Sequence, residues 1–110
     1  MLKINGTTIT LTRGDSALIT LTLTYKNGDF YEPAEGDQIR FAVKKDFNDL
    51  VSPLLFITIP TDTLLLYISP EQSKGLAYGQ YKYDIQLTTA SGDVDTFIDK
   101  ATLVITEEVD

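Results

Sequence analysis

Apolar and polar residues alternate with a period of two along three segments of the chain, residues 17–25, 39–44 and 80–87. Successive side chains of a β-strand point to opposite faces of a sheet, so this period predicts three strands that each bury one face. The positions expected to face the core are Ile19, Leu21, Leu23, Tyr25, Ile39, Phe41, Val43, Tyr81, Tyr83, Ile85 and Leu87.

Short turn signals separate the expected strands. They are rich in Gly, Asn and Asp, which tolerate positive φ or bond their own backbone. Short strands joined by frequent turns predict an all-β sandwich or barrel. Parallel pairs usually need long crossover connections, so all pairing is expected to be antiparallel. The turn signals lie at residues 5–6, 13–15, 27–29, 35–37, 61–62 and 91–93.

One helical turn is predicted near residue 70. Ser69 can cap it, Pro70 suits the first helical position, and Gln72 can complete a capping box. Gly75 then supplies a stop signal. The predicted fold is therefore an antiparallel β-sandwich with one short helical turn.

Two further segments, residues 54–59 and 64–68, are apolar at almost every position. The four residues between them, 60–63, predict a hairpin. Its core-facing pairs would be Ile59 with Leu64, Ile57 with Leu66, and Leu55 with Ile68.

The same hairpin would carry a second apolar face. A strand in a two-layer sandwich directs only one face at the core, so Phe56, Leu65 and Tyr67 are expected to lie together on the outside. A loop of the same chain or another protein molecule must then cover them. We favour another molecule, which makes these three residues the candidate partner-contact patch.

Composition favours one globular domain over residues 1–110. The chain is 43% hydrophobic and 23% charged, which is typical of a folded domain that buries one core. It contains no Cys and no His, which removes disulfides, thiolate zinc sites and every histidine-dependent nucleophile. The expectation is a protein without enzymatic activity and without a cofactor or bound transition metal.

Charge argues against two classes of partner. The net charge is −7, and residues 46–110 hold eleven Asp and Glu against three Lys and Arg. Such a surface repels phosphate backbones and anionic lipids, so neither nucleic acid nor a membrane is an expected partner. The first residues lack the apolar run of a signal peptide, and no apolar stretch approaches the ~20 residues of a membrane span.

Two short motifs invite a functional interpretation. Arg13-Gly14-Asp15 spells the integrin-binding tripeptide, but a turn between strands is favoured. Asp93, Asp95 and Asp99 could gather around calcium. Their spacing does not match that of a calcium-binding loop, so a solvated hairpin is favoured.

Two other groups of residues allow either a structural or a functional interpretation. Asp46 and Asp49 could serve acid–base chemistry, but nothing in the sequence indicates a cleft between them. Several aromatic residues near loops could form a stacking platform for a sugar or a peptide, although core packing is favoured for them. They are Tyr25, Phe30, Tyr31 and Phe47.

The run that follows the helical turn, residues 78–83, is similar to the approach to strand F in immunoglobulin-like sandwiches. The resemblance implies that Tyr81 is a corner tyrosine, whose hydroxyl bonds the backbone a few residues upstream. The chain has no Cys and no Trp, so it departs from antibody domains.

A closer resemblance extends over nearly the whole chain. The chain resembles small immunoglobulin-like proteins of phages and prophages of Gram-positive bacteria, including the amino-terminal domain of baseplate upper proteins. Members are virion building blocks of tails and baseplates, and no activity is attributed to the sandwich. The segments that carry the resemblance are residues 12–15, 17–24, 26–28, 41–45, 68–71 and 81–87.

The leading hypothesis is therefore a non-enzymatic phage or prophage structural protein. It would act through protein–protein contacts in a tail or baseplate, with other phage structural proteins or a second copy of itself as partner. It would reside in the virion, or in the bacterial cytoplasm during assembly. The alternative is a carbohydrate-binding or adhesion-type β-sandwich module that uses loop aromatics.

Overall fold

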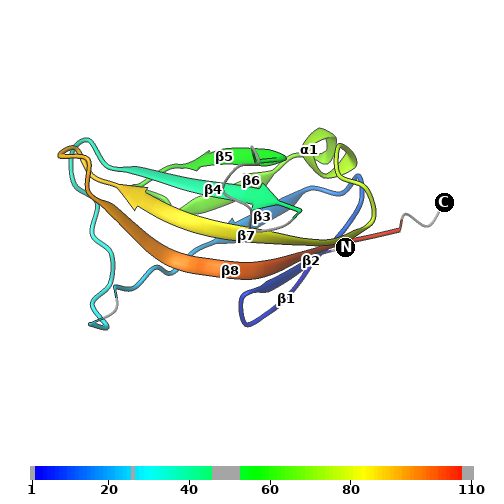
Figure 1. Ribbon diagram of the computed structural model, residues 1–110, viewed down its shortest axis with the longest axis horizontal. Helices are drawn as coiled ribbons and strands as arrows, with labels where there is room; N and C mark the ends of the chain where they lie inside the picture. The colour runs from blue at the N-terminus through cyan, green and yellow to red at the C-terminus, as the bar shows by residue number, and fades with distance from the viewer. Residues whose placement is uncertain (1, 26, 46–52, 108–110) are drawn as a thin grey trace.

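The computed structural model describes residues 2–25, 27–45 and 53–107, and strands dominate them (Figure 1). Strands account for 54% and helix for 5% of the structure, so the all-β prediction is confirmed. The elements in chain order are β1 (Leu2–Asn5), β2 (Thr8–Thr12), β3 (Ala17–Thr20), β4 (Gln38–Lys44), β5 (Leu55–Ile59), β6 (Leu65–Ile68), α1 (Pro70–Lys74), β7 (Gly79–Thr88) and β8 (Val94–Thr106).

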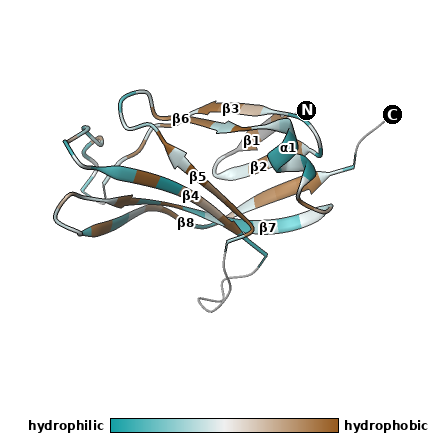
Figure 2. Ribbon diagram, turned by 90° about the horizontal axis from the view of Figure 1, so that it is seen from above, coloured by the Kyte–Doolittle hydropathy of each residue, from teal (hydrophilic) through white to brown (hydrophobic). Residues whose placement is uncertain are grey.

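The strands form two sheets that face each other across the core. The larger sheet has six strands in the order β1-β2-β8-β7-β4-β5, and the smaller one contains only β3 and β6. Figure 2 shows β3 and β6 on one side of the interior and β4, β7 and β8 of the larger sheet on the other. Most fully buried side chains come from the inner faces, among them Leu11, Ile39, Phe41, Ile59, Leu66, Ile68, Ile85, Leu87, Leu103 and Ile105.

The predicted alternation is correct for β4 and β7. Ile39, Phe41 and Val43 are buried, and so are the four predicted positions of β7. The first predicted strand is shorter than expected, because β3 ends at Thr20. Beyond it the chain turns back on itself, with the Tyr25 N–H donating to the Asp29 carbonyl over 2.8 Å.

One strand pair contradicts the prediction of antiparallel pairing throughout. β2 runs parallel to β8, with Ile9 opposite Leu103 and Thr12 opposite Thr106. The prediction assumed that parallel neighbours need a dedicated helical crossover. Here the intervening strands β3 to β7 make the connection, so no such helix is needed. All other strand pairs in the described residues are antiparallel.

The predicted hairpin of residues 54–68 is wrong. β5 pairs with β4 in the larger sheet, and β6 pairs with β3 in the smaller one. The connection between them therefore crosses from one sheet to the other. A hairpin would only have extended one sheet, whereas the crossing lets both strands bury an apolar face in the same interior from opposite sides. The predicted core face is correct, since Ile59, Leu66 and Ile68 are buried.

Two local predictions near β7 are confirmed. In α1 the Gln72 N–H donates to the Ser69 Oγ over 3.1 Å, and the Ser69 N–H donates to the Gln72 Oε1 over 2.8 Å, which completes the capping box. The Tyr81 hydroxyl donates to the Ala77 carbonyl over 2.7 Å, as expected of a corner tyrosine. No helix in the described part of the chain is long and apolar enough to cross a membrane.

Candidate functional site

The Arg13-Gly14-Asp15 tripeptide is a turn docked onto α1. Gly14 has φ 88° and donates its N–H to the Ser73 Oγ over 3.0 Å. The Ser73 hydroxyl in turn donates to the Asp15 carbonyl over 2.8 Å, and the Arg13 Nε donates to the Leu76 carbonyl over 3.1 Å. These bonds fix the tripeptide against the domain, so its interpretation as a structural turn is confirmed.

The three candidate calcium ligands lie in the turn between β7 and β8 and along β8 itself. Asp93 lies in the turn between β7 and β8, where its N–H donates to the Thr89 Oγ1 over 3.2 Å. Asp99 lies in β8, where its negative charge raises the pKa of the Asp84 carboxyl in β7. Among the described residues, no three His, Cys, Asp or Glu side chains are grouped closely enough to hold a metal ion. Asp46 and Asp49 lie outside the described residues.

Two of the loop aromatics belong to the interior. Tyr31 is buried, and its ring centroid lies 5.7 Å from that of Phe97, which also contacts Tyr25 at 5.3 Å. Burial and a 2.7 Å hydrogen bond to the Asp37 Oδ2 raise the pKa of the Tyr31 hydroxyl. Core packing is thus confirmed for this tyrosine. Phe30 is 69% exposed, and Phe47 lies outside the described residues.

The predicted contact patch is divided between two surfaces. Phe56 is 50% exposed on the outer face of β5, whereas Leu65 and Tyr67 lie on β6, in the other sheet. Tyr67 is 51% exposed and stands opposite Leu18 of β3, which is 62% exposed. The apolar surface of the smaller sheet thus consists of Leu18, Leu65 and Tyr67, and we call it the β3–β6 outer face.

Sequence reasoning missed Leu18 as part of this surface. It lies between Ala17 and Ile19, which point into the core, so the alternation itself assigns it to the outside. A leucine at an outward position of a half-buried strand was the available signal.

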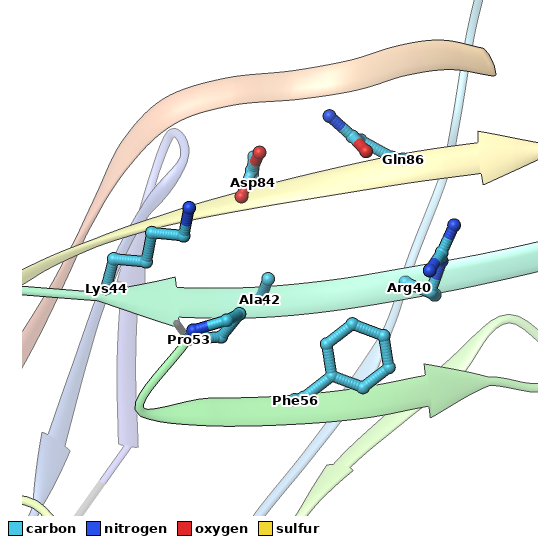
Figure 3. Close-up of a pocket in the computed structure, with 7 residues that line it drawn as sticks. All are labelled: Arg40, Ala42, Lys44, Pro53, Phe56, Asp84 and Gln86. Atoms are coloured by element: carbon cyan, nitrogen blue, oxygen red, sulfur yellow. The ribbon is translucent and has the colours of Figure 1, made fainter. Parts of the chain in front are cut away.

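A second candidate site is a hollow on the outer face of the larger sheet (Figure 3). Its volume is about 240 Å³, and strands β4, β5 and β7 form its walls. Ala42 lies at its floor, because its neighbours across the sheet are Phe56 on β5 and Asp84 on β7. We call it the Ala42 hollow; its lining residues are Arg40, Ala42, Lys44, Pro53, Phe56, Asp84 and Gln86.

The side chains around the hollow differ in how firmly they are held. The Arg40 Nη2 donates to the Thr88 Oγ1 over 2.9 Å, and its guanidinium lies 5.7 Å from the centroid of the Phe56 ring. The Lys44 and Gln86 side chains make no hydrogen bond within the described part of the chain. The hollow therefore keeps an ammonium group and a carboxamide available for a ligand.

Asp84 supplies the acidic group of the hollow. Partial burial raises the pKa of this carboxyl, the charge of Asp99 raises it further, and Lys44 partly offsets both effects. The site can therefore offer hydrogen-bond donors, hydrogen-bond acceptors and one aromatic face. The available signal in the sequence was an alanine between Arg40 and Lys44 at an outward strand position.

No model of a known protein family matches the chain, and no curated protein matches it.

Proposed function

We propose that the protein is a non-enzymatic structural component of a phage or prophage tail or baseplate, acting through protein–protein contacts. The observation that carries this proposal is the exposed cross-strand pair of Leu18 and Tyr67, at 62% and 51%. Leu65 beside them extends the apolar surface. Adjacent apolar side chains on a rigid sheet favour burial against another protein.

Two features support an immunoglobulin-like arrangement of the sandwich. One is the corner hydrogen bond between Tyr81 and Ala77, which follows a single helical turn. The other is the packing of two separate sheets around one core. Both agree with the resemblance to phage immunoglobulin-like proteins.

The proposed partner presents a flat apolar surface to the β3–β6 outer face. Only two strands form this surface, so the contact is small and needs a rigid, complementary partner. Other tail or baseplate proteins are the primary candidates, and a second copy of the chain is the other. Assembly would take place in the bacterial cytoplasm and leave the protein in the virion.

Replacement of both Leu18 and Tyr67 by Ser tests the proposal. Sedimentation velocity measures self-association, and co-purification with the proteins encoded by neighbouring genes measures hetero-association. We expect the double variant to lose at least tenfold in affinity with an unchanged far-ultraviolet circular dichroism spectrum. Phe56→Ser is the matched control, since Phe56 is equally exposed on the other sheet.

Three results would contradict the proposal. One is a wild-type protein that associates with none of these partners. The second is a double variant that associates normally, and the third is an equal loss of affinity in Phe56→Ser.

A further inference from the structure

We propose that the Ala42 hollow binds a single ring of a neutral, hydroxyl-rich carbohydrate. This goes beyond the proposed structural function and uses a different face of the molecule. The site also differs from the loop aromatics that the sequence suggested for sugar binding, because none of Tyr25, Phe30 and Tyr31 is among its lining residues.

The hollow exists because a small residue stands among long ones on a rigid surface. Ala42 is flanked along β4 by Arg40 and Lys44, and across the sheet by Phe56 and Asp84. β4 is paired on both sides over this stretch, so its backbone is fixed. Alanine is disfavoured in strands because larger side chains pack better there. At this position its small side chain leaves the hollow open.

The polar groups match hydroxyls better than they match a charged ligand. Hydroxyl groups both donate and accept hydrogen bonds. Lys44 can donate to them, Asp84 can accept from them, and Gln86 can do both (Figure 3). Lys44 and Asp84 carry opposite charges, and Arg40 keeps its positive charge while its Nη2 donates to the Thr88 Oγ1.

The charges around the hollow cancel. Arg40 and Lys44 line it together with Asp84, and the charge of Asp99 acts on Asp84 as well. Two positive and two negative groups leave no net charge to attract a charged ligand. A neutral ligand therefore fits the hollow better.

Phe56 supplies the apolar contact that a sugar ring needs. It lines the hollow and is 50% exposed, so a ring can lie against its side chain. The volume of about 240 Å³ lies below the roughly 300–1,000 Å³ typical of pockets for drug-sized ligands. One ring therefore fits, with the rest of a glycan extending into solvent.

Nuclear magnetic resonance titration of the 15N-labelled protein tests the site. The probes are the methyl glycosides of glucose, galactose and N-acetylglucosamine, and N-acetylglutamate represents an acidic protein side chain. We expect at least one glycoside to shift the backbone amides of residues 40–44 and 84–86. A single ring in a shallow site predicts a Kd of about 1 mM.

Two variants locate the binding. Ala42→Val fills the hollow and should weaken binding at least tenfold while the circular dichroism spectrum stays unchanged. Gln38→Val is its matched control, because Gln38 lies on the same strand and face but outside the hollow, and it should bind like the wild type.

The proposal is overturned if no glycoside shifts these amides, or if Ala42→Val binds as well as the wild type. Tighter binding of N-acetylglutamate than of every glycoside would also overturn it, and would assign the hollow to an acidic protein partner. The variant with Ser at positions 18 and 67 should keep sugar binding, so this proposal and the structural one fail independently.

Discussion

Gly36 and Ala90 meet where the turn before β4 touches the turn between β7 and β8. A β-carbon added to Gly36 would stand 2.5 Å from the Ala90 β-carbon, a distance that real contacts do not reach. Gly36 also has φ +84°, where L-residues are strained. Two independent constraints therefore require glycine at this position.

Gly36→Ala should be more destabilising than Gly28→Ala. Both residues have positive φ, and nothing lies within 4 Å of a β-carbon added at Gly28. Gly28→Ala should thus cost only the conformational strain, about 1–2 kcal/mol. Gly36→Ala should cost a further 1–3 kcal/mol, roughly, for the clash. Urea unfolding of the two variants measures the difference, and equal losses would show that the two turns separate without penalty.

Tyr81→Phe should lower the free energy of unfolding by about 0.5–1.5 kcal/mol. The change removes the hydroxyl that bonds Ala77 but keeps the ring, over which the Lys45 Nζ lies at 4.7 Å. Tyr67→Phe is the control, because Tyr67 is half exposed and should lose little. A thermal unfolding midpoint that drops equally in both variants would contradict a stabilising role for the hydrogen bond between Tyr81 and Ala77.

Ser73→Ala should destabilise the domain by about 1–3 kcal/mol. The Ser73 side chain is fully buried, and its loss removes the acceptor for the Gly14 N–H and the donor to the Asp15 carbonyl. The turn of residues 13–15 would then lose both hydrogen bonds to Ser73 and keep the bond from the Arg13 Nε to the Leu76 carbonyl. Ser91→Ala, at an exposed turn position, should change stability by less than about 0.5 kcal/mol. Denaturant unfolding compares the two.

Asp84→Asn should stabilise the protein at pH 7. Burial and Asp99 raise the pKa of Asp84, so the folded state binds a proton here more tightly than the unfolded state does. Ionisation therefore costs stability as pH rises through the raised pKa, and this cost is absent in strong acid. The gain from Asp84→Asn should shrink as pH falls toward 3.

Asp99→Asn provides the companion measurement. It removes the neighbouring charge and should also stabilise the fold at neutral pH, by a smaller amount, because burial is the larger cause of the shift at Asp84. Stability that is unchanged by both substitutions between pH 3 and 7 would contradict this account.

The inner faces of β4 and β7 could be predicted from sequence because a period of two is a local property. Phe41 and Ile85 are buried in the structure at the positions that the alternation assigned to the core. The capping box at Ser69 was equally local, since its two hydrogen bonds join residues three apart. Such features depend on the neighbours along the chain.

Strand partners could not be predicted in the same way. The apolar residues around Phe56 and Tyr67 indicate two buried strands but do not specify which strand each one pairs with. That choice depends on how the whole interior is filled. The Ala42 hollow escaped prediction for the same reason, because it forms only when strands distant in sequence bring Phe56 and Asp84 to either side of Ala42.

The parallel pair of β2 and β8 has a consequence for synthesis on the ribosome. β2 has its place in the larger sheet only when residues 103–106 lie beside it. Until β8 has emerged from the exit tunnel, β2 has only β1 as a neighbour and β7 has only β4. Pairing between segments so distant in sequence is also slow, because a long loop must close first. The domain therefore completes its fold only after β8 has left the exit tunnel, and a nascent chain stalled before β8 exposes two open strand edges to aggregation.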